Sequence, residues 1–303
     1  MSGSTANHIY HAATHVSPSQ SNSLQDDRLA TSASYAGVPL ALAIAGSDSG
    51  GGAGIQADLK TFQELSVYGM SVITAVTAQN TLGIKGIHEV GTDAVLQQLD
   101  AIGEDLTPHA VKTGMLASGD IVHAVADKLA QYGWRNLVID PVMLAKGGST
   151  LLRKEALHAL THRLIPLSRV ITPNVPEAEE LAGMTITRLS HREEAAKRIR
   201  QMGAACVILK GGHDPATKDK VVDMVYDGAN FHYMEGRRID TPHTHGTGCT
   251  YSAAVAAELA RGRDVLAAAK VARAFIQAAI EDGLRIGGGQ GPTNHFAYRR
   301  RQS

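Results

Sequence analysis

Short apolar runs alternate with amphipathic segments along most of the chain. The first run, Val38-Pro-Leu-Ala-Leu-Ala-Ile-Ala45, is almost continuously apolar. Such a run is typical of a strand in a parallel sheet that is covered on both faces, because neither side of the strand meets water. Later short runs each follow a segment whose apolar residues have helical spacing. We expect strands at 72–76, 110–112, 137–140, 170–172 and 206–210, and helices at about 55–66, 93–103, 120–132, 154–163 and 191–202.

The C-terminal third of the chain departs from this alternation of strands and helices. Residues 221–226 and 231–234 flank Asp227-Gly228, which predicts an antiparallel hairpin. Helices near 248–260 and 264–281 follow. The repeated order of strand and helix predicts a single doubly wound α/β domain, with a mostly parallel central sheet and helices on both faces. Ligands of such sheets bind beyond the carboxyl ends of the strands.

The N-terminal segment has a different composition. Residues 1–38 are rich in Ser, Thr, Ala, Asn and His and contain few large apolar residues. We therefore predict a disordered tail over 1–38 and a folded domain over 39–303. A transit peptide is the alternative, but the acidic Asp26 and Asp27 and the single Arg28 do not favour it.

Composition excludes several classes of function. Lys+Arg and Asp+Glu are equal at 29 each, and no basic surface interleaved with aromatic residues is evident, so neither nucleic acid nor an anionic membrane is an expected partner. No apolar run is long enough to span a membrane and no secretory signal is recognisable, which predicts a cytoplasmic protein. With two cysteines, a disulfide framework is not expected. Cys206 lies in an apolar run and is predicted to be a core residue.

The most informative motif is His245-Gly-Thr-Gly-Cys-Thr250, which leads directly into an Ala-rich helix. Gly246 and Gly248 allow the backbone to turn tightly and to approach a ligand closely. The start of the helix adds unpaired N–H groups and a partial positive charge, so the motif predicts an anion hole. A thiol at this position is expected to have a lowered pKa, which would make Cys249 a base or a nucleophile. A helix cap with a buried cysteine is the alternative.

Other candidate residues stand at the predicted carboxyl ends of strands. The loop Gly46–Gly54 is Gly-rich but has neither phosphate-loop nor dinucleotide spacing, so it is either a ligand loop or a flexible connection. Asp140 is placed to organise Mg²⁺, or it caps a loop before Pro141. Glu177 is a second Mg²⁺ candidate or a favourable helix-start carboxylate. Lys210 could contact a nucleotide phosphate as a point charge.

Seven segments together resemble one family. They are Ala45-Gly-Ser-Asp-Ser-Gly-Gly-Gly-Ala-Gly-Ile-Gln-Ala-Asp-Leu-Lys-Thr61, Ala78-Gln-Asn-Thr81, Lys112-Thr-Gly-Met115, Val142-Met-Leu-Ala-Lys146, Thr172-Pro-Asn-Val-Pro-Glu-Ala178, Leu209-Lys-Gly-Gly-His213 and Thr244-His-Gly-Thr-Gly-Cys249. In this order they are similar to the hydroxymethylpyrimidine/phosphomethylpyrimidine kinases of thiamine biosynthesis, which have the ribokinase-like fold. The resemblance extends from about residue 40 to His295-Phe296.

The resemblance implies a role for each matching residue. Cys249 would be the base that activates the substrate hydroxyl, within an anion hole formed by Gly246, Thr247 and Gly248. Mg²⁺ would be organised by Asp140 and Glu177. The ATP phosphates would be contacted by Asn174, Lys210 and Thr247. Gln79 would bind the pyrimidine edge, and the residues around the ring would be Asp48, Ala53, Gly54, Met115 and Val142.

The resemblance also implies a reaction. We expect ATP- and Mg²⁺-dependent phosphorylation of 4-amino-5-hydroxymethyl-2-methylpyrimidine and of its monophosphate to the diphosphate, by a homodimer. Pyridoxal or pyridoxine phosphorylation is the alternative among kinases, because the ring and the hydroxymethyl group are similar. A non-catalytic regulator that binds a pyrimidine or a nucleotide is the alternative from another class. Such a regulator would not need Cys249, Asp140 and Lys210 together.

Overall fold

The computed structural model describes residues 37–143, 154–213 and 219–302. Residues 39–303 belong to one compact unit. The predicted disordered tail lies almost entirely outside the described residues, so its disorder stays a prediction.

A nine-stranded sheet forms the centre of the described part of the chain, in the order β3-β2-β1-β4-β5-β6-β7-β8-β9. Every pairing from β2 to β7 is parallel, whereas the pairs β2–β3, β7–β8 and β8–β9 are antiparallel. The mostly parallel sheet predicted from the sequence is therefore confirmed. The strands are β1 Leu40–Asp48, β2 Tyr68–Asn80, β3 Gly83–Glu89, β4 Ala110–Thr113, β5 Leu137–Ile139, β6 Val170–Ile171, β7 Val207–Leu209, β8 Lys220–Tyr226 and β9 Phe231–Arg237.

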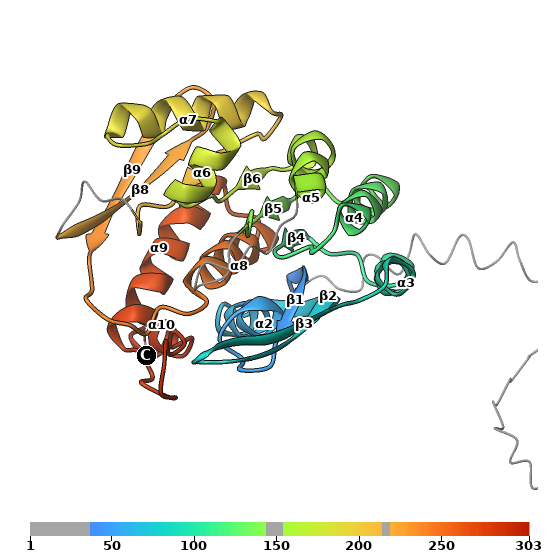
Figure 1. Ribbon diagram of the computed structural model, residues 1–303, viewed down its shortest axis with the longest axis horizontal. Coiled ribbons are helices and arrows are strands. Elements are labelled where there is room, and N and C mark those ends of the chain that lie inside the picture. Colours follow the sequence, from blue (N-terminus) through green and yellow to red (C-terminus); the bar gives the residue numbers. More distant parts are fainter. Residues whose placement is uncertain (1–36, 144–153, 214–218, 303) are drawn as a thin grey trace, which may run out of the picture. The chain divides into compact units, whose positions relative to one another are not determined.

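Helices cover both faces of the sheet, as predicted (Figure 1). One face packs against α2 Gly54–Glu64, α8 Thr247–Ala260 and α9 Val265–Glu281. The other packs against α3 Thr92–Gly103, α4 Gly119–Tyr132, α5 Lys154–Ala159, α6 Val175–Ala182 and α7 Leu189–Gln201. Short helical segments also occur at η2 Leu160–Leu164, η3 Ile165–Leu167 and α10 Ala297–Arg300.

The alternation of residue size along β1 explains how α8 reaches the centre of the sheet. Leu40, Leu42 and Ile44 face the core that contains α3 and α4. The intervening Ala41, Ala43 and Ala45 face the core that contains α8. Small side chains let a helix approach a strand closely, and α8 is itself rich in alanine. The start of α8 therefore lies beside the carboxyl ends of the parallel strands.

The largest departure from the predicted elements is near β2. This strand runs from Tyr68 to Asn80, well beyond the predicted 72–76, and it pairs with β3, which we did not predict. The signal for β3 is weak because Gly83-Ile-Lys-Gly-Ile-His-Glu89 contains two glycines and is mostly solvent-exposed. The pairing carries Gln79 to the edge of the candidate site.

Deleting residues 1–36 is expected to leave the domain intact. The first core residue of β1 is Leu40, so the truncation removes no described residue of the sheet or of its cores. We expect the free energy of unfolding to change by less than about 0.5 kcal/mol. Denaturant unfolding and a kinase assay of the truncated chain measure this. Loss of either stability or turnover would show that the tail has a structural role.

Candidate active site

A cavity of about 890 Å³ opens at the carboxyl ends of the parallel strands. Such a volume is large enough for a nucleotide phosphate chain and a small ring. The cavity brings together every site residue predicted from the sequence. Those residues are Asp48, Ala53, Gly54, Gln79, Met115, Asp140, Val142, Asn174, Glu177, Lys210, Gly246, Thr247, Gly248 and Cys249.

The start of α8 provides donors for an anion. Gly246 is the N-cap with φ +79°, and a Cβ there would lie 1.8 Å from the Gly52 carbonyl oxygen, so only glycine fits. No side chain caps this helix, and its first turn lines the cavity. Thr247 donates its hydroxyl to the Thr244 carbonyl at 2.6 Å, which fixes the turn. The free N–H groups and the positive end of the helix dipole favour a phosphoryl group here.

A buried ion pair lies beside this helix start. Lys210 Nζ donates to Asp140 Oδ1 at 2.8 Å, and both side chains are almost fully buried. A Cβ on Gly248 would be 3.4 Å from that Nζ. Burial alone raises the pKa of Asp140, but the charges of Lys210 and Lys112 outweigh it and lower the pKa. Asp140 is therefore ionised at neutral pH.

Asn174 and Glu177 form a capping box at the start of α6. Asn174 Oδ1 accepts from the Glu177 N–H at 2.9 Å, and Glu177 Oε2 accepts from the Asn174 N–H at 2.8 Å. Both residues thus have a structural function in addition to any contact with a ligand. Burial, reinforced by the negative charge of Asp140, raises the pKa of Glu177 to about 7.

The two carboxylates fit a hydrated Mg²⁺. Oxygen donors are the ligands that Mg²⁺ prefers, and a cation would relieve the repulsion that Asp140 exerts on Glu177. Within the described ranges there is no cluster of three or more His, Cys, Asp or Glu residues able to hold a metal ion. The remaining ligands would then be phosphate oxygens and water, which is the usual arrangement for Mg²⁺.

The predicted lowering of the Cys249 pKa is wrong. Burial, aided by the negative charges of Asp58 and Asp140, raises the pKa of this thiol to about 11. Lys112 and the Gly54 N–H act in the opposite direction but do not offset desolvation. The sequence places Cys249 correctly at a helix start, but it does not show how deeply the thiol is enclosed. Cys249 is therefore a thiol at neutral pH.

Sequence reasoning missed a buried ion pair behind Cys249. Lys112 Nζ on β4 donates to both carboxylate oxygens of Asp58 on α2, at 2.8 and 2.9 Å. Both side chains are fully buried, and Lys112 also lines the cavity. The sequence did contain a sign of this pair, namely a lysine within the strand Ala110-Val-Lys-Thr113. A strand buried on both faces tolerates a charged side chain only when that charge has a partner.

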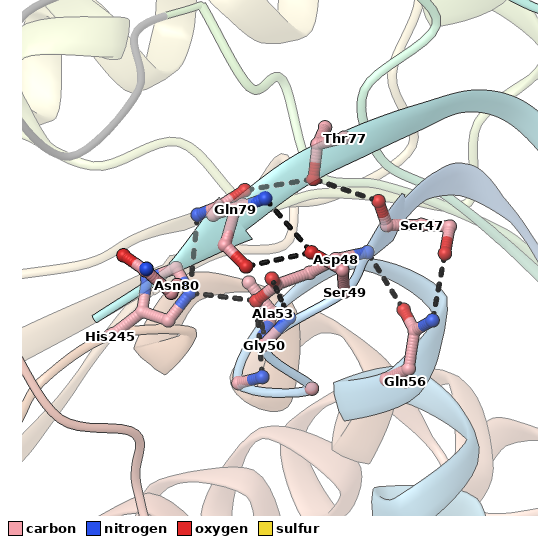
Figure 2. Close-up of polar contacts among 12 residues, drawn as sticks. Ser47, Asp48, Ser49, Gly50, Ala53, Gln56, Thr77, Gln79, Asn80 and His245 are labelled. Atoms are coloured by element: carbon pink, nitrogen blue, oxygen red, sulfur yellow. Dashed lines mark hydrogen bonds and ion pairs between the residues drawn. The ribbon is translucent and has the colours of Figure 1, made fainter. Parts of the chain in front are cut away.

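The glycine-rich loop is organised by Asp48 (Figure 2). Asp48 Oδ1 accepts from the Gly50 N–H at 2.8 Å, and Oδ2 accepts from the N–H groups of Gly52 and Ala53 at 3.0 and 2.9 Å. The loop is thus a folded structure rather than a flexible connection. It joins the end of β2 through Ser49, whose hydroxyl donates to the Gln79 carbonyl at 2.7 Å.

Gln79 lies at the cavity edge with an apolar wall nearby. Thr77 Oγ1 donates to Gln79 Oε1 at 3.1 Å, which restrains the amide. Met115 and Val142 line the same cavity. Met115 also packs against Gly46, where an added Cβ would lie 2.5 Å from its Cε. An amide beside apolar side chains is suited to a flat heteroaromatic ring with polar edges.

Comparisons with known proteins show which family this chain resembles. The family model for phosphomethylpyrimidine kinase matches residues 48–294. The hydroxymethylpyrimidine/phosphomethylpyrimidine kinase of Bacillus subtilis is 55% identical over 260 residues, covering 86% of this chain and 96% of the relative. The enzyme of that name from Haemophilus influenzae is 50% identical over 266 residues, covering 87% and 98%.

Solved structures show the same fold. An ADP complex of Bacillus subtilis pyridoxal kinase matches with a TM-score of 0.81 and 44% identity, covering 86% of this chain and 99% of that one. Phosphomethylpyrimidine kinase from Clostridium difficile matches with a TM-score of 0.71 and 41% identity, covering 80% and 99%. In the part of the chain that the structure describes, every helix is too short or too polar to cross a membrane.

Proposed function

The chain belongs to the phosphomethylpyrimidine kinase family, and we propose from this that it transfers the γ-phosphoryl group of ATP to 4-amino-5-hydroxymethyl-2-methylpyrimidine and to its monophosphate, in thiamine biosynthesis. The observation that carries this proposal is the uncapped start of α8, which shares one cavity with the Asp140–Lys210 pair and with Gln79. A phosphate site and a ring site are thus adjacent. A binding protein without catalytic function would not require Cys249, Asp140 and Lys210 together in this cavity.

The residues of this chain would position the reactants and stabilise charge. The first-turn N–H groups of α8 and Lys210 would hold the phosphate oxygens, and Gln79 would orient the ring so that its hydroxymethyl group faces Cys249. The hydroxyl oxygen then bonds to the γ-phosphorus while the bond to the ADP oxygen breaks. The hydroxyl proton passes to the Cys249 sulfur in its thiolate form, which is a minor fraction at neutral pH, and from there to solvent. Phosphoryl transfer depends mainly on such positioning and charge stabilisation.

Asp140 and Glu177 would hold Mg²⁺, which neutralises developing charge on the phosphate oxygens when it is bound. Glu177 has a pKa of about 7 and Asp140 a lowered pKa, so these two carboxylates together carry between one and two negative charges at neutral pH. Titration with Mg²⁺ at fixed ATP, monitored by turnover, tests this assignment.

An ADP-release assay with purified protein tests the proposed function. ATP and Mg²⁺ are supplied with the hydroxymethylpyrimidine, with its monophosphate, or with pyridoxal. Turnover that requires either pyrimidine supports the proposal. Absence of turnover with both pyrimidines would refute it.

Pyridoxal is the second candidate substrate, favoured by one observation. Structures named pyridoxal kinase, including that of Staphylococcus aureus in complex with pyridoxal at a TM-score of 0.80 and 36% identity, share the fold. Gln79 is the position at which the two rings would differ in polar contacts. A higher kcat/KM for pyridoxal than for the pyrimidine would make pyridoxal the principal substrate.

Gln79→Ala is expected to raise the KM for the pyrimidine more than the KM for ATP. A side-chain amide donates and accepts, which matches the amino group and ring nitrogen of an aminopyrimidine. Losing a buried hydrogen bond of this kind costs about 1–3 kcal/mol, which corresponds to roughly 5- to 150-fold in KM. Steady-state kinetics with each substrate varied in turn measure this. A rise confined to the KM for ATP would show that Gln79 is misassigned.

A homodimer is also proposed. Val76, Leu82 and Ile87 are exposed apolar side chains on β2, β3 and their connection. Burial of such a group in an interface would remove apolar surface from water. Sedimentation of wild type and of a Leu82→Lys/Ile87→Lys variant tests the proposal. The predicted cytoplasmic location stays a prediction.

A further inference from the structure

His245 lies between the glycine-rich loop and the start of α8, which belong to different parts of the active site (Figure 2). Its Nε2 lies 2.8 Å from Oδ2 of Asp48, which ends β1 and holds the glycine-rich loop. The same nitrogen is 3.4 Å from Gln79 Nε2, at the end of β2. His245 immediately precedes Gly246, the N-cap of α8. One imidazole therefore contacts the ring side of the cavity, while its backbone begins the anion hole.

The backbone of His245 is anchored from a third direction. Its N–H donates to the Gly291 carbonyl at 3.1 Å, and its carbonyl accepts from the Thr293 N–H at 3.3 Å. The imidazole is mostly buried, with 14% of the side chain exposed. The two backbone hydrogen bonds therefore fix the position from which the imidazole contacts the glycine-rich loop.

The two loops also interlock sterically. A Cβ at Gly52 would lie 2.6 Å from His245 Cδ2 and 2.9 Å from Pro292 Cβ. A Cβ at Gly246 would lie 1.8 Å from the Gly52 carbonyl oxygen. Because the loops are in direct contact, a shift of one displaces the other.

The direction of the hydrogen bond between His245 and Asp48 also determines which polar atoms of Gln79 remain available to a ligand. Burial alone raises the pKa of Asp48, but hydrogen bonds from His245, Gly50 and Ala53 outweigh it and lower the pKa. Asp48 is therefore ionised and can only accept, so His245 Nε2 must donate to it. The same nitrogen cannot accept from Gln79 Nε2. The amide N–H of Gln79 is thereby left for a ring acceptor.

We propose that His245 is a positioning residue that couples the glycine-rich loop, and through Ser49 of that loop the strand end at Gln79, to the anion hole of α8. This coupling would keep the pyrimidine hydroxyl and the phosphoryl group correctly placed relative to each other. This inference rests on the proposed kinase function. It assigns Asp48 to the same coupling: the carboxylate holds the loop and receives the imidazole N–H, and it is not required to contact the ring.

Two substitutions at His245 test the coupling. His245→Leu removes the imidazole N–H that donates to Asp48, whereas His245→Gln retains a side-chain N–H that can extend to a similar distance. Loss of a hydrogen bond to a charged group typically changes a binding constant by a factor on the order of 10 to 100. His245→Leu is therefore expected to raise the KM for the pyrimidine by such a factor and to lower kcat. The KM for ATP should stay within about threefold, and His245→Gln should recover most of the loss. His232→Leu, at the start of β9, is the matched control because this histidine also contacts a carboxylate, that of Asp227.

A merely structural role predicts a different pattern. Destabilisation would reduce the active fraction and hence kcat, with both KM values unchanged, and that result would overturn the proposal. Glutamine performing no better than leucine would also overturn it. In a double-mutant cycle, His245→Leu and Asp48→Ala should be strongly non-additive because each removes the same contact. Additive losses would contradict the coupling.

Hydrogen exchange separates this inference from the proposed function. The Gly50, Gly52 and Ala53 amides donate to Asp48, so exchange in residues 46–56 should be faster in His245→Leu than in wild type or in His232→Leu. This measurement requires no substrate. Unchanged exchange would refute the coupling even if the enzyme is active. A wild-type protein that phosphorylates neither pyrimidine would instead refute the proposed function.

Discussion

Cys249→Ala is expected to lower kcat by about 10²–10⁴-fold and to leave the KM for ATP nearly unchanged, because the substitution removes the proton acceptor and no nucleotide contact. The thiol lies at the first turn of α8, which lines the cavity. Cys249→Ser should also be poor because a serine hydroxyl ionises far less readily than a thiol and so supplies even less of the charged proton acceptor. Saturation kinetics of the three proteins with the pyrimidine measure this effect.

The raised pKa of Cys249 predicts the pH dependence of that effect. With a pKa of about 11, the thiolate fraction rises about tenfold for each pH unit between 7 and 10. If the thiolate accepts the proton, wild-type kcat increases with pH over this range until another step limits the rate. The increase should be absent in Cys249→Ala. A Cys249→Ala enzyme with nearly full kcat would show that the thiol only packs against its neighbours.

Alkylation provides a check without substrate turnover. Cys249 lines the cavity, whereas Cys206 is buried in the core and burial raises its pKa to about 12. A maleimide or iodoacetamide should therefore modify Cys249 first, slowly at pH 7 and faster at pH 9. Bound pyrimidine should protect it. Modification of Cys206 at an equal rate would contradict the accessibility difference.

The topology of a parallel sheet explains why candidate residues far apart in sequence line one cavity. Asp140 and Lys210 follow different strands, and all carboxyl ends of parallel strands meet at one edge. Strand-end position and residue type therefore predicted that both residues lie at the same edge of the sheet, but their ion pair was found only in the structure. The core strands were similarly predictable, since uninterrupted apolar runs such as Leu40–Ala45 identify strands that are covered on both faces.

Properties that depend on tertiary enclosure were not predictable. The pKa of Cys249 depends on its burial and on the charges of Asp58 and Asp140, and these residues are far from Cys249 in sequence. The Lys112–Asp58 pair is separated by 54 residues. The contact between His245 and Asp48 spans 197 residues. Local motifs supplied the residue types at these positions, but only folding determined which of them are partners.

The Asp140–Lys210 pair leads to the second large effect. Lys210→Ala and Asp140→Asn are both expected to lower kcat by about 10²–10³-fold, the usual cost of losing one group that stabilises transition-state charge. Lys210→Ala also leaves the buried Asp140 without its cation, which costs about 3–5 kcal/mol of stability. Thermal unfolding must therefore accompany the kinetics, so that turnover is expressed per folded molecule. Lys220→Ala, which removes an exposed lysine paired with Glu235, is the matched control and should resemble wild type.

Magnesium should distinguish the two variants. Asp140→Asn retains oxygen as a weaker ligand, so a higher Mg²⁺ concentration should fill the site and recover part of the lost turnover. Lys210→Ala lacks a charge that contacts phosphate, and added Mg²⁺ does not replace a point charge at that position. Turnover measured from low to high Mg²⁺ at saturating ATP gives the comparison. If both variants respond alike, Asp140 and Lys210 act as one electrostatic unit, and the assignment of the carboxylate to the metal and of the lysine to phosphate is wrong.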